Sequence, residues 1–395
     1  MRTVEEHQRV VAGLISARPA VTVPLADALG LALADDVVAP LSLPGFDNSA
    51  MDGYAVLAAD VAGASAENPV KLPVAEDIPA GRTDLLTLVP GTAHRIMTGA
   101  MLPAGATAVV PVESTDAATD TVSIFAAAVE GRHIRRAGED VTAGMTVLSA
   151  GEVLSPAALG LAAALGFAEL KVIPRQRVLV LSTGTELVTP GTPLQPGQIY
   201  ESNAVMLAAA LREAGADVTT APATSDDVAL FRETLAGHAT DVDLIVTTGG
   251  VSAGAYEVVK DALAHDVEFV KVAMQPGMPQ GAGTVNGTPI VTLPGNPVSA
   301  LVSFEVFIRP PLRAAMGLTS QRPRRSATLT EQLTSPAGKR QFRRGVLGTD
   351  EQVSSYGPPA SHHLRWLATA NCLLDIGEDV VELAAGSPVP VWDLS

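Results

Sequence analysis

The stretch RVLVLSTGTEL at residues 177–187 decides the fold of the central part of the chain. RVLVLS (177–182) is an apolar run, as expected for a strand that is buried on both faces of a parallel sheet. The glycine turn STGTEL (182–187) follows it directly. The stretch therefore predicts a buried strand that ends in a tight turn.

Strand and helix patterns alternate after this turn and predict repeated βα units. Such units form a parallel, three-layer α/β domain, which we place over residues 173–317. Its ligands are expected beyond the carboxyl ends of the strands. The expected helices are 202–216, with Ser202 as N-cap and Gly215 at its end, and 225–237, capped by Ser225 or Asp226; the further strands lie in DVTTAPA (217–223), DLIVTTGG (243–250) and PIVTLPGNP (289–297).

Three glycine turns end three of these strands: STGTEL, TTGGVSAG (247–254) and LPGNPVSA (293–300). Glycine lets backbone N–H groups approach a ligand, and the helix N-terminus that follows favours anions. One such turn is usually only a connection, but three on one sheet edge can converge on one phosphate-bearing ligand. None matches the dinucleotide fingerprint or the P-loop. The expected ligand-facing residues are Ser182, Gly184, Gly249, Gly250, Ser252, Gly295 and Asn296.

The flanking regions indicate further domains. Residues 1–40 open with a helix and a short turn-and-helix unit (23–37), and residues 141–172 are alanine-rich and helical in pattern. Residues 41–140 between them are rich in Gly, Pro, Thr and Val, which predicts a β-rich domain inserted into a discontinuous helical one. After the linker RPRR (322–325), residues within 318–395 alternate apolar and polar side chains and predict a small all-β domain.

Composition excludes several classes of protein. A net charge of −16 argues against a general nucleic-acid binder. The single cysteine, Cys372, excludes an internal disulfide and fits the reducing cytoplasm. No secretion signal opens the chain, and its longest apolar stretch, 157–168, is too short to cross a membrane. We expect that stretch to be a buried helix.

Carboxylates gather in loops, whereas cations are scarce, with only five lysines. Each carboxylate alone is typical of a helix cap or a solvated turn. Together, near phosphates, they indicate a Mg²⁺ site, because Mg²⁺ prefers one or two carboxylates with phosphate oxygens and water. For the cations a solvated surface and an oxyanion clamp are both open. The carboxylates are Asp47, Asp52, Glu139, Asp140, Glu186, Asp226 and Asp227, and the cations are Arg135, Arg136, Lys271, Arg343 and Arg344.

The histidines form no ligand set, and no Ser-His-Asp or Cys-His arrangement is present in the sequence pattern. His362 and His363 are adjacent, so on a strand they would face opposite ways. Most of the histidines are therefore expected to be structural or on the surface.

At these motifs the sequence resembles the MoeA proteins and the C-terminal domain of gephyrin, which are molybdopterin molybdenumtransferases. The matching segments run in order along nearly the whole chain: GFDNSAMDGYAV, HRIMTGAMLPAGATAVV, IRRAGEDV, LSTGTEL, GQIYESN, TTGGVSAG, LPGNPVSA and RRGVLG. The resemblance implies a four-domain subunit in an elongated homodimer, with an α/β domain similar to MogA and MoaB. It also implies a Mg²⁺-dependent insertion of molybdate into molybdopterin-AMP, with release of AMP, and contacts with other cofactor-biosynthesis proteins.

The resemblance carries residue roles by motif. Asp52, Asp140, Glu186 and Asp227 are implied as catalytic, and Glu186 with Asp226 or Asp227 as metal ligands. The site is expected to be composite, with the β-rich domain of one subunit facing the α/β domain of the other. Further implied substrate contacts are Thr98, Pro294, Pro297, Arg344 and Ser361.

The sequence departs from the family pattern at four positions. Thr185 stands where the family often has Asp, Gln275 and Met278 replace two lysines, and Glu257 replaces an Asp. Two cations are thereby lost, so Lys271 is the nearest one left.

Two other functions compete with this interpretation. A MogA-type adenylyltransferase would need only the α/β domain, and a gephyrin-like scaffold would need a partner-binding extension that the sequence lacks. The sequence does not separate molybdate from tungstate.

Overall fold

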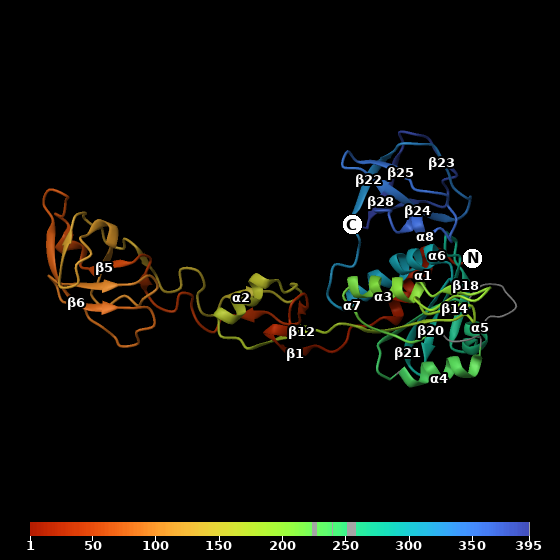
Figure 1. Ribbon diagram of the computed structural model, residues 1–395, viewed down its shortest axis with the longest axis horizontal. Helices are drawn as coiled ribbons and strands as arrows, with labels where there is room; N and C mark the ends of the chain where they lie inside the picture. Colours follow the sequence, from red (N-terminus) through yellow and green to blue (C-terminus); the bar gives the residue numbers. More distant parts are fainter. Residues whose placement is uncertain (223–226, 239, 251–257, 395) are drawn as a thin grey trace. The chain divides into compact units, whose positions relative to one another are not determined.

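A computed structural model describes residues 1–222, 227–238, 240–250 and 258–394 of the chain (Figure 1). The chain divides into two compact units. Unit 1 comprises residues 1–22, 30–34 and 171–395, and unit 2 comprises residues 23–29 and 35–170.

The centre of unit 1 is a six-stranded sheet in the order β16-β13-β17-β21-β20-β18. Its first four strands are parallel, as the βα pattern predicts. β20 alone runs against them, antiparallel to both of its neighbours β21 and β18, which the βα pattern does not predict. The reason is the turn at Asn286 and Gly287, both with positive φ, because a two-residue hairpin cannot make a parallel crossover. The strands are β13 (Arg177–Ser182), β16 (Asp217–Thr220), β17 (Leu244–Thr248), β18 (Val267–Lys271), β20 (Pro279–Val285) and β21 (Thr288–Leu293).

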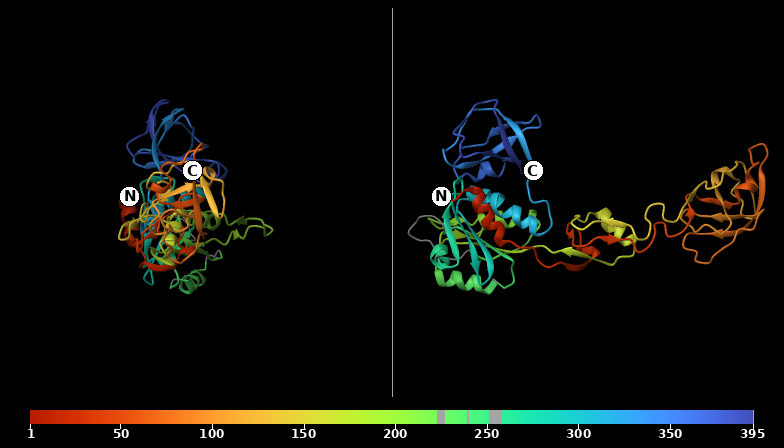
Figure 2. Two further views of the ribbon diagram at one scale, coloured as in Figure 1. Left: turned by 90° about the vertical axis from the view of Figure 1, so that its left-hand side faces the viewer. Right: turned by 180° about the vertical axis from the view of Figure 1, so that it is seen from behind.

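Helices cover both faces of this sheet, which confirms the three-layer prediction (Figures 1 and 2). Alternate residues of β13 point to opposite faces: Val178 and Val180 belong to one apolar cluster, and Leu179 and Leu181 to another. The first cluster includes residues of α1 (Val4–Leu14), α3 (Asn203–Glu213), α6 (Pro297–Ser303) and α7 (Arg309–Ala315); the second includes residues of α4 (Val228–His238) and α5 (Val258–Leu263).

A π-helical turn, η4 (Phe304–Ile308), interrupts the run from α6 to α7. Pro310 and Pro311 follow within one turn and have no N–H to donate, so the regular hydrogen-bond ladder cannot continue through this point. The helix α1 packs against η4 and α7, although it is far away in sequence.

The C-terminal part of unit 1 is a small β domain, as predicted. Five strands close into a ring, because β22 pairs with β25 and β28 while β24 pairs with β25 and β26, and β26 pairs with β28. RPRR is not a free linker: Arg322 forms ion pairs with Glu213 and Glu305, and Arg324 begins a strand. The elements are β22 (Arg324–Leu329), β23 (Leu333–Thr334), β24 (Arg340–Leu347), β25 (Gln352–Ser355), α8 (Leu364–Leu367), β26 (Cys372–Ile376), β27 (Glu382–Leu383) and β28 (Pro388–Asp393).

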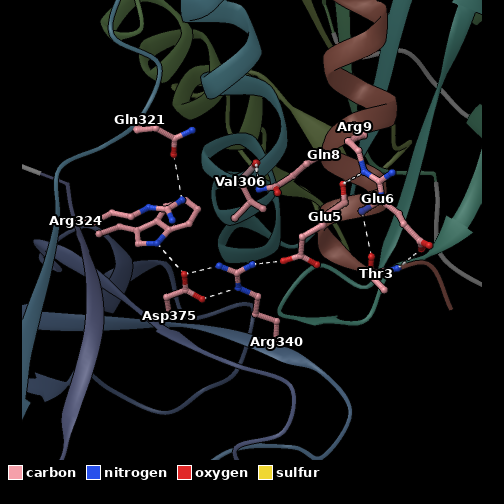
Figure 3. A network of polar contacts seen from close by, with 11 residues as sticks. Thr3, Glu5, Glu6, Gln8, Arg9, Val306, Gln321, Arg324, Arg340 and Asp375 are labelled. Atoms are coloured by element: carbon pink, nitrogen blue, oxygen red, sulfur yellow. Dashed lines mark hydrogen bonds and ion pairs between the residues drawn. The ribbon is translucent and has the colours of Figure 1, made fainter.

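Polar contacts tie this β domain to α1 (Figure 3). The Arg340 guanidinium donates to both oxygens of Asp375, each at 2.7 Å, and to Glu5 of α1 at 2.5 Å. The Trp392 indole N–H donates to the same Asp375 carboxylate. The short strand β19 (Met274–Gln275) also pairs with β24. These contacts hold the β domain in place against the α/β domain.

Unit 2 contains the β-rich region that the sequence predicts. Its main sheet has the order β8-β5-β7-β6-β9, with a core that includes Tyr54, Val110 and Ile124. Smaller sheets join β10 with β4 and β11 with β3. The strands are β3 (Val37–Val38), β4 (Asn48–Ser49), β5 (Gly53–Val56), β6 (Val70–Ile78), β7 (Ala93–Ile96), β8 (Ala108–Pro111), β9 (Thr121–Ile124), β10 (Ile134–Arg135) and β11 (Thr146–Leu148).

Two local helix expectations are wrong. The predicted turn-and-helix at 23–37 is mainly β1 (Val21–Pro24), a 3-10 turn η1 (Leu25–Asp27) and β2 (Ala32–Leu33). The alanine-rich helix α2 (Pro156–Ala164) is shorter than expected and half-exposed, with only Ala162 buried. Residues Glu169–Ile173 form β12, which pairs with β2 and alternates between exposed and buried side chains as a strand does. Alanine favours helix locally but does not decide burial.

A buried histidine of α1 predicts a pH-dependent stability. His7 has an exposed fraction of 0%, and its ring meets Phe307 edge-on at 4.7 Å. Burial, with help from Arg2 and against Glu268, lowers its pKa to about 4. Below pH 6.5 the unfolded chain binds a proton that the folded chain does not, so stability falls as pH drops from 6.5 towards 4. At pH 5 the loss relative to neutral pH is about 2 kcal/mol.

Melting curves at pH 7.5 and pH 5 test this prediction. His7→Leu should show a smaller change in Tm between the two pH values than the wild type. An equal change in both proteins would mean that other groups titrate instead.

Candidate functional site

The strand ends of the α/β domain surround a cavity of about 1170 Å³. All three predicted glycine turns line it, with three further walls from residues 199–203, from residues 275–279 and from the 359–364 loop of the C-terminal β domain. Of the expected residues, the structure brings together Ser182, Gly184, Glu186, Gly249, Gly250, Pro294, Gly295, Asn296, Pro297 and Ser361. Ser252 and Asp226 lie outside the described residues.

The three turns contact one another closely. Gly249 has φ +93°, and a Cβ built there would lie 2.6 Å from the carbonyl oxygen of Thr183 in the first turn. A Cβ on Gly295 in the third turn would lie 3.4 Å from the Gly249 Cα. The second turn therefore fits between the other two only because position 249 has no side chain.

Asn203, the first residue of α3, links the second and third glycine turns through its side chain. Its side-chain Nδ2 donates to Thr248 Oγ1 (3.0 Å) and to the carbonyl of Gly295 (2.7 Å). The Thr248 hydroxyl donates in turn to the carbonyl of Pro294. The ends of β17 and β21 are thus held by one amide.

The C-terminal β domain closes one side of the cavity through Ser361. Asn296 Nδ2 donates to Ser361 Oγ at 2.9 Å, and the Val298 N–H donates to the Ser361 carbonyl at 3.1 Å. The Arg344 guanidinium stabilises the 358–363 loop by donating to the carbonyls of His363 (3.0 Å) and Pro358. Only 3% of Arg344 is exposed, and it does not line the large cavity. Burial lowers the pKa of its guanidinium.

These contacts give Arg344 a role other than the oxyanion clamp considered from sequence. We expect Arg344→Ala to release the 358–363 loop, raising KM for the substrate and lowering Tm together. The expected loss of stability is about 1 kcal/mol, since two part-buried carbonyls lose their donor.

Arg343→Ala is the matched control for that variant. Arg343 donates to Ser355 and Thr334 instead, so its loss should leave KM unchanged. A raised KM with an unchanged Tm in Arg344→Ala would instead favour direct contact with substrate.

The cavity carries negative rather than positive side chains. Among its described lining residues there is no lysine or arginine, and the two carboxylates are Glu186 and Glu201. Lys271 ends β18 but is not part of the lining. Gln275, one of the two positions that replace a family lysine, does line the cavity. An anionic ligand therefore needs a counter-charge from elsewhere.

The predicted metal ligands are only partly assembled. Glu186 is exposed in the cavity wall, whereas Asp227 Oδ1 accepts from the backbone N–H groups of Ala229 (2.8 Å) and Leu230 (3.1 Å). Asp227 therefore caps α4, the ordinary role of such a residue. In the described parts of the chain no three His, Cys, Asp or Glu side chains form a group that could hold a metal ion. Asp227 is not part of the described cavity lining, so a Mg²⁺ ion held by Glu186 would take its other ligands from substrate and water.

The other predicted carboxylates lie in unit 2. Asp52 Oδ1 accepts from both the backbone N–H (2.7 Å) and the hydroxyl (2.8 Å) of Thr98, so these two predicted residues are neighbours. The backbone hydrogen bond is the main cause that lowers the pKa of Asp52. Asp140 is exposed in the loop after β10. Asp47 and Arg136 form an ion pair at 2.5 Å, which fastens that loop to the segment before Asp52.

Sequence reasoning overlooked the wall at 199–203. Ile199 and Tyr200 form β15, which pairs with β14 (Leu187–Val188), and Glu201, Ser202 and Asn203 lead into α3. All five residues line the cavity. The sequence does contain a signal for this wall, because the segment GQIYESN (197–203) leads directly into an expected helix. His362 also lines the cavity, and its ring packs against that of His363 at 4.2 Å.

Comparison with known proteins covers the whole chain. Residues 2–166 match the MoeA N-terminal region (domain I and II), residues 179–314 a probable molybdopterin binding domain, and residues 326–394 the MoeA C-terminal region (domain IV). The chain is 69% identical to molybdopterin molybdenumtransferase 2 of Mycobacterium tuberculosis H37Rv over 100% of both chains. It is 38% identical to molybdopterin molybdenumtransferase 1 of the same strain over 99% and 98%.

A solved structure is similar over the same extent. The crystal structure of the molybdopterin biosynthesis MoeA protein from Pyrococcus horikosii shares 30% identity and a TM-score of 0.84, covering 100% of this chain and 99% of that one. Separately, no helix within the described residues is both long and apolar enough to cross a membrane.

Proposed function

Since this chain belongs to the MoeA family, we infer that it is a molybdopterin molybdenumtransferase, which inserts molybdate into molybdopterin-AMP and releases AMP. One observation carries the inference: three glycine turns converge on a single large cavity in a chain that matches its relatives from end to end. A MogA-type adenylyltransferase is not favoured, because its resemblance would stop at the α/β domain. The relatives are named as molybdenumtransferases, so their names do not favour a scaffold without catalytic activity.

The cavity can position the two reactants. Backbone N–H groups of the glycine turns suit the phosphate of the nucleotide, and the turns are fixed relative to one another by Asn203 and Gly249. Molybdate and phosphate are both anions, so the protein must hold them together against Coulomb repulsion. The dithiolene of the substrate supplies the ligands for molybdenum, and the main task of the protein is orientation.

Mg²⁺ is the counter-charge that we propose for this site. When bound, it would neutralise phosphate charge and stabilise AMP as the leaving group. Glu186 would hold it from the cavity wall, and Asp226 or Asp227 would add a second carboxylate. In Asp227 the oxygen left for this purpose is Oδ2, because Oδ1 caps α4.

We further propose a cytoplasmic homodimer with a composite site, to which the partner subunit contributes Asp52, Thr98 and Asp140. The support is the family resemblance, which matches both the N-terminal region that carries these residues and the α/β domain. Contacts with other proteins of cofactor biosynthesis belong to the same proposal.

A mixed dimer tests the composite site. Asp52→Asn and Glu186→Gln chains should each be inactive alone, and a mixture refolded together should regain about a quarter of wild-type activity, because half the dimers are mixed and each has one intact site. The control is a mixture of Asp52→Asn with Asp140→Asn, which should stay inactive. Failure of the first mixture to recover would place both residues in the same subunit's site.

Two reactions test the function itself. The chain should release AMP from molybdopterin-AMP when molybdate is added, and should not form molybdopterin-AMP from molybdopterin and ATP. The opposite pattern would make it an adenylyltransferase, and no reaction in either assay would favour the scaffold. Tungstate in place of molybdate shows which oxyanion is preferred.

A further inference from the structure

The cavity wall at residues 359–364 contains a side chain that can carry a positive charge. Among the lining residues that the structure describes there is no lysine or arginine, and His362 is the one histidine. It is exposed, so a ligand in the cavity has access to it. Histidine is the side chain that ordinarily gains or loses its charge between pH 5 and pH 8. His362 can therefore offer the cavity a cation that depends on pH.

The residues on both sides of His362 fix its backbone in place. The carbonyl of Ser361 accepts from the N–H of Val298 at 3.1 Å. On the other side, the carbonyl of His363 accepts from the Arg344 guanidinium at 3.0 Å. The His363 ring also meets the His362 ring edge-on, with 4.2 Å between the ring centroids. A group that is positioned before its ligand arrives loses less freedom on binding.

Ser361 supplies a second donor beside His362. Its Oγ accepts from Asn296 Nδ2 at 2.9 Å, which leaves the hydroxyl proton available for another acceptor. Ser361 lines the same cavity. A tetrahedral oxyanion presents several acceptors and no donor, and hydrogen bonds from a charged donor to such an anion are among the strong ones. An imidazolium next to a hydroxyl is therefore suited to an oxyanion.

The charged groups around His362 are of both signs. Glu186 and Glu201 line the cavity and repel an incoming anion. Arg344 and Arg365 are not in the lining: Arg344 donates to backbone carbonyls, and Arg365 packs over an aromatic ring at 5.1 Å. The helix α6, which packs against α8, has no charged side chain. Among the described lining residues, the proton on His362 is thus the charge that can offset the carboxylates.

We propose that protonated His362, together with the Ser361 hydroxyl, binds a tetrahedral oxyanion in this cavity. The inference rests on the proposed function, because that reaction brings two such groups, molybdate and the nucleotide phosphate, to one site. Since the imidazolium is the binding form, oxyanion binding strengthens as pH falls. By the same linkage, the bound anion favours the protonated ring, so binding takes up protons near neutral pH.

Isothermal titration calorimetry of the full chain, with molybdate and AMP as separate probes, tests this inference. The wild type should bind the oxyanion on the order of tenfold more tightly at pH 6 than at pH 8, the effect of one charge-assisted hydrogen bond. Titrations at pH 7 in two buffers of different ionisation enthalpy should show proton uptake. Because the phosphate of AMP itself titrates near pH 6, each probe is judged by the difference between wild type and variant.

The informative variant is His362→Gln, whose amide can still donate a hydrogen bond but cannot become a cation. It should lose most of the proton uptake and bind the oxyanion roughly tenfold more weakly at pH 6. His362→Lys keeps a positive charge at both pH values, so it should bind molybdate equally well at pH 6 and pH 8. His265→Gln, at an exposed position outside the cavity, is the matched control and should behave like the wild type.

The two probes identify the oxyanion. A loss for molybdate in His362→Gln places the metal oxyanion at this wall, and a loss for AMP places the nucleotide phosphate there. Unchanged affinity and pH dependence for both probes would overturn the inference. So would an equal loss in folded His362→Gln and His362→Lys, because ring shape rather than charge would then matter.

The same titrations keep this inference separate from the proposed function, since they need no turnover. Oxyanion binding that depends on the His362 charge, in a chain that releases no AMP from molybdopterin-AMP, would leave the inference standing and remove the proposed function. Normal AMP release by a chain whose oxyanion binding does not change with pH would do the reverse.

Discussion

Glu186→Gln is expected to reduce AMP release roughly 100-fold or more while Tm stays nearly the same. Glu186 is exposed in the cavity wall, so the change removes no buried contact. Exposed substitutions usually alter stability by within about 0.5 kcal/mol. What is lost is a negative charge at the place where the proposed Mg²⁺ must meet the phosphates.

A Mg²⁺ titration distinguishes a ligand from a structural residue at position 186. If Glu186 binds the cation, raising Mg²⁺ should restore part of the activity of Glu186→Gln. Glu233→Gln, the same change at an exposed position of α4, serves as a control for the chemical change alone and should retain wild-type turnover. A Tm that falls by several degrees, with activity lost only in proportion to folded protein, would make Glu186 structural and the metal assignment wrong.

Gly249→Ala is expected to have the second large effect, on both turnover and stability. An alanine at φ +93° costs about 1–2 kcal/mol. Its Cβ would also meet the Thr183 carbonyl oxygen at 2.6 Å, and a backbone atom cannot move aside cheaply. The second turn must therefore shift away from the first and third, which separates the three turns that line the cavity. A shift of about 1 Å can cost about 100-fold in rate.

Gly386→Ala separates backbone strain from damage to the site. Gly386 has φ +84°, but a Cβ there meets nothing within 4 Å, and it lies outside the cavity. In urea unfolding, Gly386→Ala should lose about 1–2 kcal/mol from backbone strain alone, and Gly249→Ala should lose more because of its clash with Thr183. Only Gly249→Ala should lose turnover per folded molecule. Equal turnover in the two would show that the close packing of the turns is not needed for catalysis.

The strand-end turns were predictable because their signal is local. Buried strands read as apolar runs and glycine marks each turn, so RVLVLSTGTEL and its two counterparts locate one edge of the sheet before any contact is known. The antiparallel pairing of β20 with β21 also has a local signal, the pair Asn286–Gly287 between two strand-like runs. The repeated βα pattern around it favours a parallel strand instead.

Contacts between distant segments were not predictable. Nothing in RRGVLG indicates that Arg344 donates to the carbonyls of His363 and Pro358 rather than to a ligand, since the loop returns only through the fold. The place of His362 in the cavity wall likewise depends on the fold, because its loop is distant in sequence from the glycine turns. The helix α1 reads as part of a local helical domain, yet it packs on η4 and α7, about three hundred residues away.

We infer that this cavity exchanges AMP for molybdenum on one substrate. The most direct measurement is a single turnover of molybdopterin-AMP with molybdate and Mg²⁺, in which released AMP and pterin-bound molybdenum are counted in the same sample. We expect one AMP to be released for each molybdenum bound, and neither product to form without molybdate. AMP release without molybdenum on the pterin, or molybdenum uptake while AMP stays attached, would contradict it.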